Sequence, residues 1–142
     1  MNKSSYLKWE PQYSVGVEIL DQQHRKLFDI VNDLTDEIEM GSKNLLPVIH
    51  DLVNYLSVHF KQESIVMMES NYPGYMKHSR EHHDFTEKVK TFLQDCERGD
   101  EELGTKMIVF LKEWIFNHTT RLDMEYAHYL KDMAEKRNSS QA

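Results

Sequence analysis

The sequence predicts an all-α fold: an up-down-up-down antiparallel four-helix bundle with an N-terminal arm. Apolar residues recur at spacings of three and four along four long segments, which is the helical period. Glycine and proline are scarce and fall between these segments, where helices end. No segment alternates apolar and polar residues as a half-buried strand would. Helices of about 20 residues, each ~30 Å long, joined by short turns pack as antiparallel neighbours.

The first two helices have clear boundary signals. We expect the first helix to start near Asp21, a candidate N-cap, and to end before Gly41. The second helix is expected to start around Pro47, because proline suits an early helical position, and to run to about Ser70.

The third and fourth helices follow a turn. The residues NYPG at 71–74 are typical of a turn and precede a third helix from about Tyr75 to Arg98. The fourth helix is expected from about Glu101 to Lys136.

The chain divides into one main domain and two short ends. Residues 1–18 lack a helical period but include Trp9 and Tyr13, so we expect an arm packed on the bundle. Residues 19–137 form the bundle itself. Residues 138–142 are polar and are expected to form a disordered tail.

Composition limits the possible partners and compartments. The chain has 142 residues and a formal net charge of −7, which suits one domain and disfavours nucleic acid or an anionic membrane as partner. The single cysteine, Cys96, excludes an internal disulfide and fits a reducing compartment. No apolar run resembles a signal peptide or reaches the ~18 residues of a membrane span. We therefore expect a cytoplasmic protein, and the mixed acidic surface is compatible with a monomer.

Each of the four expected helices carries at least one histidine on its apolar stripe, the face that points into the core. Of the eight histidines, five continue an apolar helix face and are expected to point inward: His24, His59, His78, His82 and His118. Glu63 lies one turn after His59 on the same stripe. The other three lie off the stripes and are expected at the surface: His50, His83 and His128.

This inward set favours a metal site. A single inward histidine is usually a core residue with one hydrogen bond. Five imidazoles and the carboxylate of Glu63 are too many for a simple hydrogen-bond scheme, and a buried unpaired carboxylate is costly. A metal ion binds neutral imidazole nitrogen and ionised carboxylate oxygen directly.

Asp123 is harder to place from spacing alone. It follows His118 by five residues, and on a regular helix this is ~500°, about 140° away from the same face. A locally widened turn of the π type would bring it back to that face. Alternatively, Asp123 lies on the flank and reaches across, or it forms a surface ion pair.

These residues resemble the pattern of the hemerythrin family, most of all its single-domain bacterial form, the bacteriohemerythrins. The shared pattern is His24, then His59-Phe60-x-x-Glu63, then His78-x-x-x-His82, then His118-x-x-x-x-Asp123. Flanking segments are similar too, such as YSVGVEILDQQHRKLFDIVNDL and YPGYMKHSREHHDF. The resemblance extends over about residues 9–131.

The resemblance implies a non-haem di-iron centre with an oxo or hydroxo bridge. One iron would have the three ligands His78, His82 and His118. The other would have His24 and His59, while Glu63 and Asp123 would bridge both ions. The resemblance thereby favours Asp123 as a ligand. The second iron would keep one open position, where O₂ would bind reversibly, and the pocket lining would be Leu27, Phe60, Trp114 and Ile115. These four are also ordinary core residues.

Two positions depart from the family pattern. Ser64 replaces a second acid that often follows the bridging glutamate, and it should face away from the metals. Thr119 replaces an aliphatic residue that often follows the histidine of the fourth helix. A hydroxyl there could admit water and speed autoxidation.

The function expected from the resemblance is O₂ storage, transport or delivery rather than catalysis. A di-iron oxidase, peroxidase or nitric-oxide-handling enzyme is the first alternative, but five histidines against two acids favour binding over oxygen activation. An O₂ or redox sensor acting through an unidentified protein client is the second alternative. Zinc or manganese is a weaker choice of metal, since affinity alone does not select iron.

Overall fold

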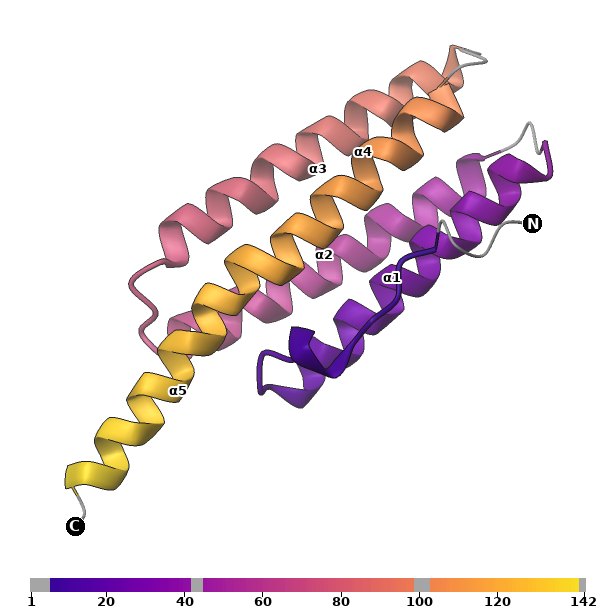
Figure 1. The fold of residues 1–142 in the computed structure, drawn as a ribbon. Coiled ribbons are helices and arrows are strands. Elements are labelled where there is room, and N and C mark those ends of the chain that lie inside the picture. Colours follow the sequence, from indigo (N-terminus) through magenta and orange to yellow (C-terminus); the bar gives the residue numbers. More distant parts are fainter. Residues whose placement is uncertain (1–5, 42–44, 99–102, 141–142) are drawn as a thin grey trace.

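The computed structural model describes residues 6–41, 45–98 and 103–140, and every regular element in these ranges is helical. Four long helices run up, down, up and down, and they confirm the predicted all-α bundle (Figure 1). The last of them has three contiguous parts, α4, η3 and α5. The elements are η2 (Pro11–Tyr13), α1 (Glu18–Glu39), α2 (Leu46–Glu69), α3 (Tyr75–Glu97), α4 (Leu103–Asn117), η3 (His118–Leu122) and α5 (Asp123–Ser140).

The helices form a closed ring of neighbours around the core. α1 packs against α2 and α4, and α3 packs against the same two helices. The apolar core has a larger and a smaller cluster, and a polar layer separates them. In α1, His24 lies between Leu20 of the smaller cluster and Leu27 of the larger one. In the last helix the polar residues lie between Ile115 and Tyr126. The bundle thus encloses a polar layer between the two apolar clusters.

The start of α1 differs from the expectation. The helix begins at Glu18, and Asp21 is therefore not the N-cap. The Asp21 side chain is buried and accepts hydrogen bonds from the backbone N–H of Val15, at 2.8 Å, and from the hydroxyl of Ser14. Asp21 therefore fixes the preceding segment against the first turn of the helix.

The segment before α1 packs along the bundle (Figure 1). Leu7 and Asn32 form a pair of hydrogen bonds: the Leu7 N–H donates to Oδ1 at 2.8 Å, and Nδ2 donates to the Leu7 carbonyl at 2.9 Å. Trp9 and Tyr13 pack against the larger apolar cluster. The side chains of this segment thus cover part of the core.

The C-terminal end of the last helix also differs from the expectation. The expected start at Glu101 lies outside the described residues. At the other end α5 continues to Ser140, so residues 138–140 are helical where a disordered tail was expected. In Figure 1 α5 extends past the ends of the other helices. A search of the described helices finds none that is long and apolar enough to span a membrane.

Candidate metal centre

The polar layer contains all seven side chains that the sequence indicated. Each is between 1% and 5% exposed, and together they come from all four long helices: His24, His59, Glu63, His78, His82, His118 and Asp123. The three histidines expected at the surface are exposed: His50, His83 and His128. The helical period therefore separated the inward from the outward histidines correctly.

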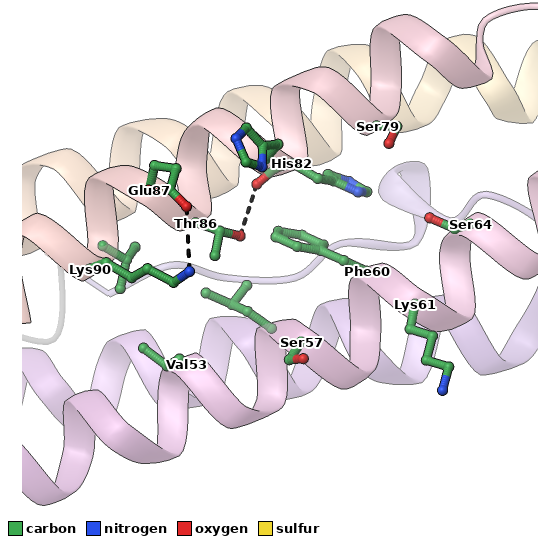
Figure 2. A pocket seen from close by; sticks show the side chains of 13 residues that line it. Val53, Ser57, Phe60, Lys61, Ser64, Ser79, His82, Thr86, Glu87 and Lys90 are labelled. Atoms are coloured by element: carbon green, nitrogen blue, oxygen red, sulfur yellow. Dashed lines mark hydrogen bonds and ion pairs between the residues drawn. The ribbon is translucent and has the colours of Figure 1, made fainter.

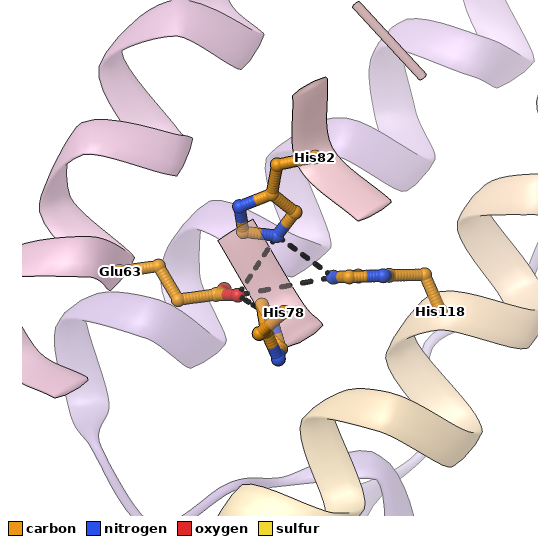
Figure 3. Close-up of side chains that lie close together, drawn as sticks. All are labelled: Glu63, His78, His82 and His118. Carbon is orange, nitrogen blue, oxygen red and sulfur yellow. Dashed lines mark hydrogen bonds and ion pairs between the residues drawn. The ribbon is translucent and has the colours of Figure 1, made fainter. Parts of the chain in front are cut away.

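Three histidines converge on one side of this layer (Figure 3). Nε2 of His82 lies 3.2 Å from Glu63 Oε1, and His78 contacts the same oxygen. Nε2 of His118 lies 3.8 Å from that oxygen and 3.1 Å from Asp123 Oδ1. His78 Nε2 is 3.0 Å from Asp123 Oδ1. These nitrogens form the three-histidine set.

Two histidines face the other oxygens of the same two carboxylates. Nε2 of His59 is 3.0 Å from Glu63 Oε2, and Nε2 of His24 is 3.3 Å from that atom. His24 Nε2 is also 3.0 Å from Asp123 Oδ2. Glu63 and Asp123 thus each direct one oxygen to the three-histidine set and the other to the two-histidine set.

A π segment places Asp123. The five residues of η3 have the wider π turn, and the helix then resumes its α form at Asp123. The wider turn brings Asp123 back to the helix face of His118. This is the first of the three alternatives that the sequence left open for Asp123. The surface ion pair is excluded, because the Asp123 side chain is 2% exposed.

Two buried or half-buried side chains outside the expected set orient the histidines. Gln23 Oε1 accepts a hydrogen bond from His59 Nδ1 at 2.8 Å, and Glu81 Oε1 accepts one from His118 Nδ1 at 3.1 Å. Sequence reasoning missed both. Each precedes a ligand candidate by one residue, yet each contacts a histidine of another helix, which spacing along one helix cannot show.

The donor set fits a cation. With Nδ1 of His59 and His118 donating outward, each neutral ring presents the lone pair of Nε2 to the carboxylates. His82 and His118 place their Nε2 atoms 2.9 Å apart. Within the described part of the chain, both buried carboxylate oxygens of Asp123 lack a hydrogen bond. Imidazole nitrogens and carboxylate oxygens that converge in this way are the donor atoms that a metal ion binds in place of protons.

The pKa values show the same competition between burial and charge. Burial lowers the pKa of His24, but the carboxylates of Asp123 and Glu63 outweigh it and raise the value to about 10. The pKa of His118 is likewise raised, although burial opposes this. Burial dominates at His82, whose pKa falls to about 4. Burial raises the pKa of Glu63, but the surrounding histidines bring it well below its usual range. Both carboxylates are thus ionised at neutral pH.

Aromatic and aliphatic side chains surround the cluster. Leu27 and Ile115 are 3% and 1% exposed and belong to the larger apolar cluster. Trp114 stacks on His118 with ring centres 4.4 Å apart, and Phe60 stacks on His82 at 3.8 Å. These are the four residues that the resemblance assigns to the ligand pocket.

A groove between α2 and α3 reaches the edge of this layer (Figure 2). Its volume is about 470 Å³, and both Phe60 and His82 line it. Hydroxyl groups line it as well, including those of Ser57 and Thr86.

The fold and the cluster define a class: a four-helix-bundle protein with a buried His/Glu cluster able to hold metal. Residues 15–130 match the family model of the hemerythrin HHE cation binding domain. The chain belongs to the hemerythrin family. Hemerythrins bind O₂ at a non-haem di-iron centre.

Known relatives agree over most of the chain. The chain is 30% identical over 126 residues to a bacteriohemerythrin of Stenotrophomonas maltophilia (strain R551-3), covering 88% of this chain and 82% of the relative. It is 30% identical over 122 residues to a hemerythrin-like protein of Naegleria gruberi, covering 86% and 92%. A crystal structure of wild-type hemerythrin superposes with a TM-score of 0.79 at 25% identity, covering 85% of this chain and 95% of that one.

Proposed function

We propose that this protein binds O₂ reversibly at a non-haem di-iron centre and acts as a monomeric carrier or store of O₂. The observation that supports this most is the division of each carboxylate between two histidine sets. In this proposal the two ions share Glu63, Asp123 and an oxo or hydroxo group. One ion has the ligands His78, His82 and His118, and the other has His24 and His59.

The donor count leaves one position open. Three imidazoles, two carboxylate oxygens and one shared oxygen make six donors on one side. On the other side, two imidazoles with the same two carboxylates and the shared oxygen make five donors. The sixth position stays open, and an open position is where an external ligand binds. Two ferrous ions held by these ligands would supply the two electrons that reversible O₂ binding requires.

The residues around the centre favour binding over turnover. Leu27 and Ile115 add apolar surface, and the rings of Phe60 and Trp114 cover two of the histidines. Glu63 and Asp123 are ionised, so neither carries a proton that it could deliver to bound O₂. Carboxylates that hold no proton support release of O₂ rather than its reduction.

The test is anaerobic loading of the purified protein with ferrous iron, followed by an iron count per chain. Visible spectra are then recorded through repeated cycles of oxygenation and degassing. We expect two irons per chain and an absorption band that forms with O₂ and disappears on degassing. A band that forms once and persists, or continuous O₂ consumption with a reductant, would instead indicate a di-iron enzyme.

A further inference from the structure

We propose that Glu81 is a positioning residue that makes the three-histidine metal position the tighter and more easily oxidised of the two. This rests on the proposed di-iron function. The carrying observation is the different charge of the two outer partners: a carboxylate behind His118 and an amide behind His59.

Glu81 connects two helices at the edge of the centre. It lies on α3, directly before His82, while the ring that it contacts belongs to His118 in η3. Its Oε1 accepts the Nδ1–H bond at 3.1 Å, and Trp114 stacks on the same ring with an interplanar angle of 11°. The imidazole of His118 is thus held at its edge and on its face, with Nε2 directed into the cluster.

Among the described residues, no carboxylate accepts a hydrogen bond from Nδ1 of the two-histidine set. Its outer partner is Gln23, whose amide oxygen lies 2.8 Å from His59 Nδ1. An amide orients the ring as well as a carboxylate does, but it carries no charge. His24 Nδ1 is buried and has no hydrogen-bond partner among the described residues. The two histidine sets therefore differ in the charge of the side chain that accepts their Nδ1–H bond, as well as in the number of imidazoles.

A carboxylate that accepts the Nδ1–H bond of a histidine changes how strongly that histidine binds a metal. A carboxylate draws the Nδ1 proton toward itself, which makes Nε2 a stronger electron donor to a metal. The hydrogen bond is charge-assisted and stronger than a neutral one. The Glu81 side chain is 26% exposed, so water screens part of its charge, but the contact with His118 remains direct. The stronger donor should favour binding at this position and favour the ferric state there.

The experiment is a calorimetric titration of the metal-free full-length protein with Co²⁺ alone. We expect wild type to bind two ions in two resolved steps. Glu81→Gln keeps a hydrogen-bond acceptor and removes the charge, and should weaken the tighter step by roughly 10- to 100-fold. Gln23→Glu adds a charge behind His59 and should strengthen the weaker step. The matched control is Glu87→Gln, an exposed change on the same helix, which should titrate like wild type.

A second readout separates electronic tuning from a merely structural role. In the iron-loaded protein, Glu81→Gln should raise the reduction potential of one iron, while Glu87→Gln should not. Wild-type affinities for both steps and unchanged potentials in Glu81→Gln and Gln23→Glu would overturn this inference and leave the proposed function intact. Fewer than two ions in wild type would overturn both.

Discussion

Asp123 follows His118 by five residues, yet its Oδ1 lies 3.1 Å from His118 Nε2. The two side chains share a face because η3 adds the length that a regular α-helix lacks. The π turn also leaves one oxygen of the Asp123 carboxylate facing the three-histidine set and the other facing the two-histidine set. The π segment is therefore part of the site and not an irregularity of the helix.

Inserting an alanine after Thr120 should add a residue that the π turn does not accommodate and rotate the following residues by about 100°. Asp123 would leave the cluster, and Tyr126 would leave the core, so we expect fewer than two metal ions per chain and a lower melting temperature. Metal analysis and thermal unfolding measure the two effects. Insertion of an alanine after Asn138, near the exposed end of α5, is the control. Full metal content after the insertion at Thr120 would contradict the role of the π turn.

Glu63 and Asp123 should each serve both metal ions. Replacing either with alanine removes one oxygen from each histidine set, so we expect the content of both ions to fall. His24→Ala removes a ligand from one set and should lower the content toward one ion per chain. His50→Ala changes an exposed residue and should leave two ions bound. Equal and complete iron retention in all of these variants, measured by metal analysis, would contradict the assignment.

The sequence predicted the parts of this site that depend on a single helix. The 3.6-residue period placed His24 and the other inward histidines correctly. The same period put Asp123 off the face, because a π turn depends on packing and not on local spacing. The contacts of Glu81 and Gln23 cross between helices, so no spacing along one helix could reveal them. Asp21 was misread as a cap because its carboxylate binds the segment before the helix instead.

The metal-free protein should lose stability as the pH rises from about 7 to 9. Burial lowers the pKa of His24, but nearby carboxylates raise it from 6.5 to about 10, so its charged form is favoured in the folded state. The stabilisation by charged His24 is complete below the pKa of the unfolded state. It is lost as the pH rises towards the pKa of the folded state. Each pH unit between the two values corresponds to about 1.4 kcal/mol.

Thermal unfolding of the metal-free protein across this pH range measures the effect. The metal-loaded protein should change less, because its histidines are neutral ligands at every pH in the range. His50→Ala should follow the wild-type curve. A metal-free melting temperature that stays constant or rises between pH 7 and 9 would show that the histidines carry no stabilising charge.

Phe60 should limit the access of water and chelators from the groove. Its ring is stacked on the ring of His82 with an interplanar angle of 9°, and both residues line the groove, so Phe60 covers one face of this ligand there. Phe60→Ala should release metal faster to a chelator and should cost about 2 kcal/mol of stability, less than for a fully buried phenylalanine. Phe60→Leu keeps an apolar cover and should stay close to wild type. Equal release rates in both variants would show that entry occurs elsewhere.

Thr119 should shorten the lifetime of the oxygenated protein. Its side chain is 2% exposed and lies in η3, directly after His118 in the chain, so a hydroxyl is buried in the turn that carries this ligand. Thr119→Val has nearly the same shape without the hydroxyl, and its free energy of unfolding should stay within about 1 kcal/mol of wild type. We expect slower autoxidation, measured as the decay of the O₂-dependent absorption band at constant pH and temperature. Thr120→Val, one residue further on and only half-buried, is the control. Faster decay in Thr119→Val than in wild type would show that the hydroxyl protects the bound O₂ instead.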